Sequence, residues 1–312
     1  MKRLAVISLL TLSISLTGCT GLLKSLLSSS GSNVKFEEKG EKMDRSSWMD
    51  SFNKSLKNSN FNTDDPIKSF QINATTKIKN TTEEKNRGNT YSEESTTTGN
   101  ATYQYDANAY LYKYSSSSKS SETRKSPYGK TTESDSQSAG TFYQMNSKTL
   151  YTIDTVAKTY TTSTGDQTAE QVISYYAKNG LESVLVIFDL FVVLDTNEEL
   201  DYYQNGEIFT IYLSTKDEKT DINASNDSSK VVGEKTTNGE MTLQLNLTSG
   251  KNSFKYSIQS EALSEYKEDD LNNGHKAGDT IKSNNLSTYV ADIKFQSQNM
   301  SKLSLTGYTK LN

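Results

Sequence analysis

The sequence predicts an α+β protein built mainly from antiparallel β-strands. Two stretches alternate apolar and polar residues as strands with one buried face do, at 69–79 (SFQINATTKIK) and 241–258. Apolar residues recur at helical spacing in 43–57 and 166–178. Hydrophobic residues make up 33% of the chain, against roughly 45–50% in typical globular proteins. This low apolar content favours sheets with one face in water over a parallel sheet covered on both faces.

The amino terminus carries a secretion signal. Two basic residues precede the apolar run 4–16, which leads to the only cysteine of the chain, Cys19. Residues 16–19 (LTGC) resemble the lipobox of bacterial lipoproteins, in which a diacylglycerol is attached to the cysteine sulfur and the chain is cut just before it. The resemblance implies a signal peptide over 1–18 and a lipidated Cys19. The protein would then be held by its acyl chains on the outer face of the cytoplasmic membrane or in the outer membrane.

An uncleaved anchor helix with a chance cysteine is the alternative interpretation, but the apolar run is short for a membrane span. Residues 19–42, serine-rich and charged after GLLKSLL, are expected to form a lipidated tether. Within 43–57, Trp48, Phe52 and Leu56 follow at intervals of four and predict a helix with one apolar face. No repeat or sharp change of composition divides the remainder, so 43–312 is expected to be one domain.

Charge and residue chemistry exclude several functions. The formal charge of −4 becomes about −6 without Lys2 and Arg3, and no dense basic run is present, so a nucleic-acid partner is not expected. Lipidation consumes the only cysteine, and one histidine remains, His275, in the polar segment 267–279. That segment lacks the spacing of a calcium loop, and we interpret it as a solvated turn. We therefore expect no cofactor, metal or enzyme activity, although spacing alone leaves carboxylate pairs open.

Turn residues between alternating stretches predict hairpins. The segment 106–108 separates two expected strands, and Asn205-Gly206 is the strongest hairpin signal of the chain. Two tracts rich in serine, threonine and lysine, 115–138 and 217–239, are expected to be long polar loops. The expected strands are 69–79, 90–105, 109–114, 140–145, 149–153, 158–162, the two sides of the hairpin in 202–213, the two sides of 241–263 about the turn 249–250, 288–296 and 301–309.

The most hydrophobic stretch of the chain after the amino-terminal signal is 183–194 (SVLVIFDLFVVL). It follows the helix expected at 166–178, for which Asn179-Gly180 provides a stop signal. Its length favours a helix, although its valine and isoleucine content favours a strand. As a helix it would be about 18 Å long, too short to cross a ~30 Å hydrocarbon core.

The order of elements is similar in layout to the LolA/LppX-like lipoprotein fold: lipobox, tether, amino-terminal helix, strand meander, mid-chain helical pair, second meander. The resemblance implies a curved antiparallel half-barrel, covered on its concave face by the mid-chain helices and the amino-terminal helix. It also implies binding of a lipid or another hydrophobic ligand under these helices. The pocket wall would comprise Val184, Leu185, Ile187, Phe188, Phe191 and Val192.

Two alternatives remain at this point. The apolar residues of 183–194 would simply fill a core if the protein were a surface interaction or structural lipoprotein without a ligand. Asp189, inside the same run, is either a functional carboxylate of raised proton affinity or a residue on a wet stripe of the helix.

Overall fold

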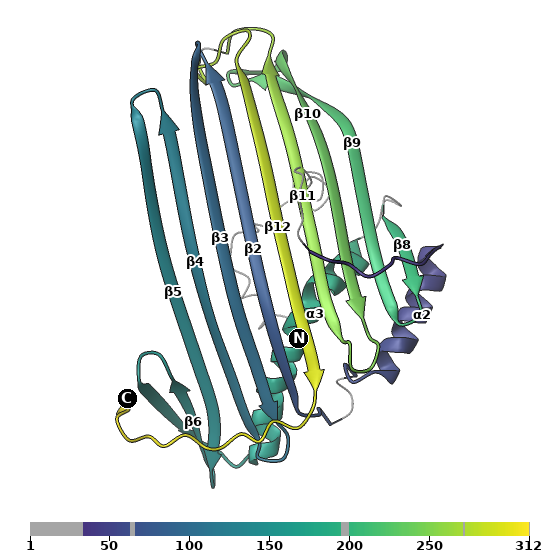
Figure 1. Cartoon of the computed structure of the whole chain (residues 1–312), viewed down its shortest axis with the longest axis vertical. Helices are drawn as coiled ribbons and strands as arrows, with labels where there is room; N and C mark the ends of the chain where they lie inside the picture. Colours follow the sequence, from purple (N-terminus) through teal and green to yellow (C-terminus); the bar gives the residue numbers. More distant parts are fainter. Residues whose placement is uncertain (1–33, 63–65, 195–199, 271, 312) are drawn as a thin grey trace.

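The computed structural model shows an antiparallel sheet whose long strands run nearly the full height of the molecule (Figure 1). It describes residues 34–62, 66–194, 200–270 and 272–311, and of residues 184–194 it describes the backbone alone. The described strands form one sheet in the order β1-β8-β9-β10-β11-β12-β2-β3-β4-β5-β6-β7-β13. Neighbouring strands pair antiparallel except β13, which pairs parallel with β7.

The sheet is built largely from hairpins of consecutive strands. Its strands are β1 (Glu41–Met43), β2 (Phe70–Asn86), β3 (Asn89–Asp106), β4 (Leu111–Ser126), β5 (Gly129–Asn146), β6 (Thr149–Asp154), β7 (Thr159–Thr164), β8 (Asp201–Asn205), β9 (Ile208–Ala224), β10 (Asp227–Asn246), β11 (Ser253–Tyr266), β12 (Thr280–Phe295) and β13 (Thr309–Lys310). The two described helices are α2 (Arg45–Asn58) and α3 (Ala169–Leu194).

The expected α+β half-barrel covered by helices is wrong. The described chain is mostly β, and its two helices lie against only one end of a thirteen-stranded sheet (Figure 1). The error lies in the polar tracts 115–138 and 217–239, which were expected to be loops. They form most of the hairpins β4–β5 and β9–β10 instead. Alternation with a buried face identifies only strands that cover a core. The tract 115–138 has no buried residue, and in 217–239 only Ala224, Val232 and Gly233 are buried.

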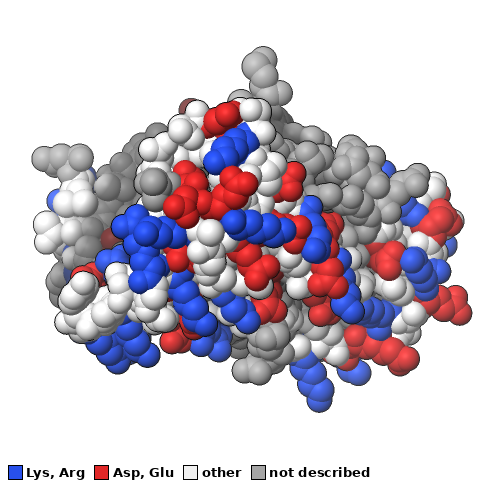
Figure 2. All heavy atoms as spheres, turned by 90° about the horizontal axis from the view of Figure 1, so that it is seen from above, with Lys and Arg blue, Asp and Glu red and all other residues white. Residues whose placement is uncertain are grey.

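The distal halves of β2–β5 contain no fully buried side chain, and only their proximal ends, at Ala101, Tyr103 and Tyr114, pack against the core. Within 75–104 and 113–139 no residue is buried, and we call these two segments the distal platform. Cross-strand ladders and side-chain pairs such as Lys79–Glu94 (2.7 Å) and Thr123–Thr132 (3.1 Å) hold it together. Threonine, frequent in these strands, is enriched in β-sheets. Viewed down its distal end, the molecule shows Lys and Arg interspersed with Asp and Glu (Figure 2).

The core lies between the proximal part of the sheet and the two helices. The expected helix near 43–57 is confirmed as α2, which begins at the cap Asp44, whose carboxylate accepts from Ser47 N at 2.9 Å. Its Trp48 and Phe52 are buried, and Trp48 stacks on Phe52 and contacts Tyr202. The indole nitrogen of Trp48 also donates to a carbonyl oxygen of β8.

The oily stretch 183–194 is helical, as its length favoured. It continues α3 without interruption, so the expected stop at Asn179-Gly180 is wrong. Gly180 is buried, and a Cβ on it would lie 2.2 Å from Tyr112 Oη. The glycine therefore serves close contact between helix and sheet rather than a helix end. Neither described helix is long and apolar enough to span a membrane.

The face opposite the helices is crossed by two irregular segments (Figure 1). The first, the N-terminal strap (34–43), crosses β11, β10 and β9 and ends as β1. The part of the expected tether from residue 34 onward is thus hydrogen-bonded to the sheet. The second, the C-terminal strap (296–308), covers Leu111, Phe142 and Ile153. A strand was expected at 301–309, but only Thr309 belongs to one.

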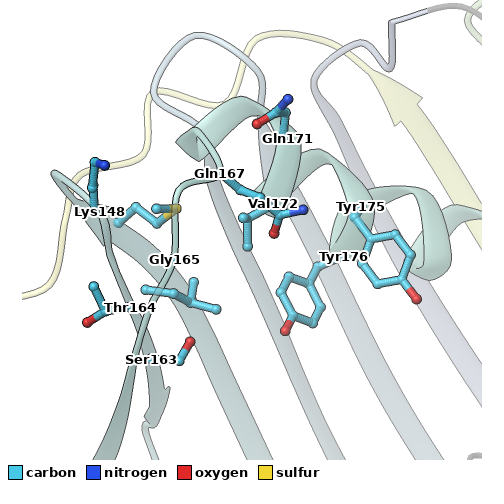
Figure 3. Close-up of a pocket in the computed structure, with 11 residues that line it drawn as sticks. Lys148, Ser163, Thr164, Gly165, Gln167, Gln171, Val172, Tyr175 and Tyr176 are labelled. Atoms are coloured by element: carbon cyan, nitrogen blue, oxygen red, sulfur yellow. The ribbon is translucent and has the colours of Figure 1, made fainter.

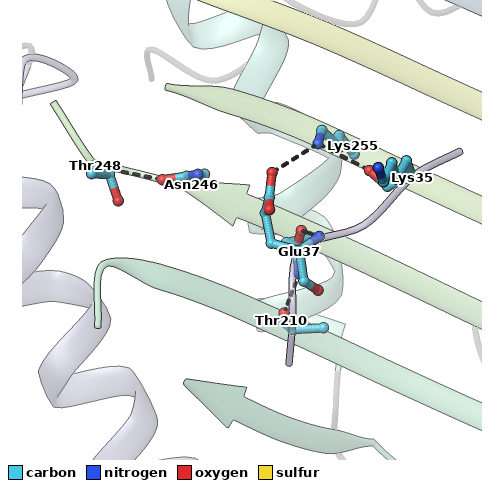
Figure 4. Close-up of polar contacts among 7 residues, drawn as sticks. Lys35, Glu37, Thr210, Asn246, Thr248 and Lys255 are labelled. Atoms are coloured by element: carbon cyan, nitrogen blue, oxygen red, sulfur yellow. Dashed lines mark hydrogen bonds and ion pairs between the residues drawn. The ribbon is translucent and has the colours of Figure 1, made fainter. Parts of the chain in front are cut away.

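One buried glutamine of the sheet hydrogen-bonds to the main chain of each strap. Gln244, 1% exposed, accepts from Glu37 N at 2.8 Å and donates to Glu37 O at 3.1 Å (Figure 4). Gln144, 2% exposed, does the same with Leu303, at 2.8 Å from its N and 3.2 Å from its O. A primary amide has one donor end and one acceptor end. The side-chain amide can therefore satisfy the N–H and C=O of one strap residue, as a neighbouring strand would.

Candidate functional site

A pocket of about 480 Å³ opens between the first half of α3 and the hairpin strands β5–β7 (Figure 3). Its position follows from the end of the sheet, where β6 and β7 are only six residues long and leave the side of α3 uncovered. The lining residues are Met145, Lys148, Leu150, Ser163, Thr164, Gly165, Gln167, Gln171, Val172, Tyr175 and Tyr176. A volume of this size lies within the roughly 300–1,000 Å³ of small-molecule sites.

A capping box sets the start of α3 and with it one rim of the pocket. Thr168 Oγ1 accepts from Gln171 N at 3.3 Å, while Gln171 Oε1 accepts from Thr168 N at 2.9 Å. These two bonds hold the carboxamide oxygen of Gln171 and leave its NH2 group available at the rim. Gln167 lies in the segment between β7 and α3 and adds a second amide to the rim.

The helix presents three different sides in this region. Ile173 and Ala177 are fully buried against the sheet. Val172 and Tyr176 are partly buried and line the pocket, and Tyr175 is 56% exposed. Two adjacent aromatic residues cannot share one helix face. One of them therefore projects toward water unless a partner covers it.

Tyr176 is held in place by an aromatic stack. Its ring lies 4.1 Å from that of Tyr143 on β5 with an angle of 21° between the planes. Burial, followed by the nearby Tyr176, raises the pKa of the Tyr143 hydroxyl above its ordinary value. The Tyr143 phenol is thus neutral at physiological pH. The two stacked rings form an aromatic wall beside the pocket.

The remaining walls divide into an apolar interior and a polar rim. Met145 and Leu150 face the helix from β5 and β6, and both belong to the main core cluster. Ser163 and Thr164 supply hydroxyls from the end of β7 (Figure 3). Lys148 is the only ionisable amine of the lining and pairs with the exposed Asp166 at 2.5 Å. The arrangement can hold an apolar group inside and hydrogen-bond a polar group at the mouth.

The residues expected to form the pocket wall do not line this pocket in the described part of the chain. Val184, Leu185, Ile187, Phe188, Phe191 and Val192, together with Asp189, lie on α3, but their side chains are outside the described residues. Cys19 and the signal peptide 1–18 lie outside them as well. The helical residues that line the described pocket, 171–176, lie about two to four turns before Val184 on the same helix.

Sequence reasoning missed this pocket because it used the apolar residues of 166–178 only to predict a helix. The adjacent pair Tyr175-Tyr176 was the available signal, since one of two neighbouring tyrosines must leave the core face. Lys148, Ser163 and Thr164 gave no signal. Only the folding of β6–β7 against α3 brings them to the pocket.

The prediction that His275 lies in a solvated turn is wrong, because its side chain is buried. It is 9% exposed and stacks on Tyr266, with ring centroids 4.2 Å apart. Its main chain pairs with Asp270, whose carboxylate accepts from Ser225 Oγ at 3.0 Å. These contacts close the distal end of β9–β12. In the described part of the chain, no three His, Cys, Asp or Glu side chains are grouped to hold a metal ion.

Comparisons with known proteins assign no family. No family model matches the chain, and no curated protein matches it. Three similar solved structures are an outer membrane channel from Pseudomonas putida F1 (8% identity, 73% of this chain, 96% of that chain, TM-score 0.19), OccK7 from Pseudomonas aeruginosa (7%, 72%, 99%, 0.17) and OprB from Pseudomonas putida (4%, 83%, 100%, 0.18).

TM-scores this low carry no argument about fold or function. The thirteen-stranded sheet with helices at one end departs from a helix-covered half-barrel. The LolA/LppX-like interpretation is therefore withdrawn.

Proposed function

We propose that this protein is a lipid-anchored lipoprotein outside the cytoplasmic membrane that binds a small amphipathic ligand in the pocket beside α3. Residues 16–19 support the anchor, because a lipobox cysteine receives a diacylglycerol. The N-terminal strap fits this arrangement, since it ties the chain that follows Cys19 to the sheet through Glu37 and Gln244.

The pocket carries the ligand part of the proposal. Its interior offers Met145, Leu150 and Val172 beside the ring of Tyr176, and its rim offers hydroxyls and amides. A ligand with an apolar chain or ring and a polar, hydrogen-bonding end matches both parts. Each CH2 group that leaves water on binding contributes about 0.8 kcal/mol, so a short apolar group suffices for retention.

Native mass spectrometry of the full chain purified from bacteria tests the ligand. We expect a bound small molecule in the wild-type protein and its loss in Val172→Trp, where the indole fills the pocket. Val231→Trp is the matched control, because Val231 is 46% exposed on β10, away from the pocket. Repeated ligand-free spectra of the wild type, or equal retention in Val172→Trp, would contradict the proposal.

The anchor has an independent test. Cells fed an alkyne analogue of palmitate should label the wild-type protein, and Cys19→Ala should abolish the label and leave an unprocessed chain. Label that persists in Cys19→Ala would show that another residue carries the lipid.

A second candidate, a surface interaction lipoprotein without a ligand, is favoured by the distal platform. A sheet of this length with no buried residue in 75–104 and 113–139 adds contact surface without adding to the core. A photo-reactive amino acid at Thr98, exposed on β3, should then cross-link a partner on intact cells. The same probe at Lys54, exposed on α2, is the control. Equal cross-linking at both positions would argue against the platform.

A further inference from the structure

The distal half of β5 is an open sheet edge. β5 runs from Gly129 to Asn146, yet β6 pairs only with its residues 141–146. Residues 129–139 therefore have a described partner strand on one side only, β4, and all of them are exposed. In Figure 1 this part of β5 borders the sheet with no strand beside it. An edge of this kind presents unpaired backbone N–H and C=O groups to another chain.

The direction of these groups follows from one hydrogen bond. Gly140 O accepts from Thr155 N at 2.8 Å, so the main chain of Gly140 points away from β4. Main-chain groups alternate in direction along a strand. Lys130, Thr132, Ser134, Ser136 and Ser138 therefore direct their N–H and C=O groups to the open edge.

This edge lacks the protection found on the other side of the sheet. The outer strand β9 has irregular register with β10 at three places, and Asp217 on it has a positive φ of 52°. Bulges of this kind twist an edge out of reach of a partner. β5 instead pairs with β4 over an unbroken register from Tyr112↔Tyr143 to Ser126↔Gly129. Its open stretch contains no proline.

Two exposed apolar side chains mark the ends of the open edge. Tyr128, 89% exposed, occupies the turn that joins β4 to β5. Val156, 50% exposed, occupies the turn between β6 and β7, next to Gly140. A strand laid along 129–139 would contact both of them.

The acidic side chains of the open edge favour an incoming strand with basic residues. Glu133 and Asp135 point to the same face of β5, since side chains two apart share a face. Glu133 lies opposite Glu122 on β4, whose carboxylate is paired with Arg124. In the part of the chain that the structure describes, neither Glu133 nor Asp135 has a cation within ion-pair distance. Basic side chains at alternate positions of an incoming strand would meet both carboxylates.

We infer that the open edge of β5 binds an extended peptide segment of another protein with lysine or arginine at alternate positions, which adds a strand to the sheet. Main-chain hydrogen bonds along 130–138 provide the affinity, and Glu133 and Asp135 provide the selectivity. A second copy of this edge fits less well, because continuous antiparallel pairing about Ser134 would set Glu133 against Asp135 of the other copy. This site is distinct from the pocket beside α3.

Peptide binding to the full chain tests the inference. The probe is a fluorescent peptide that alternates lysine with threonine, and fluorescence anisotropy reports its Kd. A peptide that alternates glutamate with threonine is the charge control. Ser134→Pro removes one outward N–H while the ladder to β4 remains, and we expect it to weaken binding by about tenfold or more. Ser134→Ala keeps that N–H and should bind like the wild type.

Hydrogen exchange identifies the binding edge directly. The lysine peptide should slow exchange of the amides of Thr132, Ser134 and Ser136 and leave the β9 edge unchanged. Glu133→Lys should weaken binding by about fivefold, whereas Glu218→Lys on β9 should not. Equal Kd values for both peptides or for Ser134→Pro, or unchanged exchange at 132–136, would overturn the inference. So would dimers of the protein alone that Ser134→Pro dissociates, since the occupant would then be a second copy.

Discussion

Gln244 holds the N-terminal strap at the point where the chain from the proposed lipid anchor meets the sheet. Its carboxamide makes three hydrogen bonds, two with the main chain of Glu37 and one to Thr210 Oγ1 at 3.0 Å (Figure 4). Gln244→Leu keeps the side-chain size and removes all three. A hydrogen bond contributes about 1 kcal/mol net, so detachment of the strap should become easier by about 3 kcal/mol.

Hydrogen exchange of the Glu37 amide measures this change at one site. A loss of about 3 kcal/mol corresponds to roughly a hundredfold faster exchange. The remaining contacts of the strap, which include Lys255 Nζ to Lys35 O at 3.0 Å and the β1–β8 pairs, should keep the protein folded.

The control is Gln296→Leu, because Gln296 is exposed after β12 and no strap contact depends on its side chain. Exchange at Glu37 should be unchanged in this variant. If Gln244→Leu left the Glu37 amide as protected as in the wild type, the amide grip would not hold the strap. Cooperative loss of protection across the whole sheet would refute the reasoning in another way, since the strap would then belong to the global folding unit.

Three further predictions concern the core and the second strap. Gln144→Leu removes two bonds to the main chain of Leu303 and should accelerate exchange of the Leu303 amide by an amount that corresponds to about 2 kcal/mol, without effect at the N-terminal strap. Gly180→Ala should lower the free energy of unfolding by about 1 kcal/mol, because the clash of its Cβ with Tyr112 Oη outweighs the better helix propensity of alanine. The same change in a Tyr112→Phe background should cost less, and equal costs in urea unfolding of the two backgrounds would exclude that clash. Burial raises the folded-state pKa of Tyr103 to about 12. The unfolded chain therefore loses this proton first, and stability should fall as pH rises from about 10 to about 12, less steeply in Tyr103→Phe; identical pH profiles would contradict this.

How much of the fold could be predicted depended on whether a segment has a buried face. The helix at 43–57 and the helical state of 183–194 were predicted correctly, because apolar spacing and length indicate them. The strands of the core, such as 241–248, alternate for the same reason. The distal platform was not predicted because its strands are rich in serine and threonine and contain no buried residue that would mark one face. A tract such as 115–138 then has the composition of a loop.

The candidate site shows the same limit. The withdrawn LolA/LppX-like resemblance placed a ligand beside 184–192, whose side chains lie outside the described residues. The described pocket needs Leu150 and Ser163 from short strands and Val172 from the helix, and nothing in their spacing joins them. Their proximity arises when the β6–β7 hairpin closes beside the helix.

The sequence by itself predicted the lipobox, the alternating strands of the core and the helical character of 45–58 and 183–194, because each depends on residues close together in the chain. Tertiary structure alone decided that polar tracts become strands and that Gly180 lies inside a helix. It also decided that Gln144 and Gln244 grip crossing segments. These outcomes depend on ladders and contacts between residues distant in sequence, where a partner strand supplies hydrogen bonds that the local sequence does not encode.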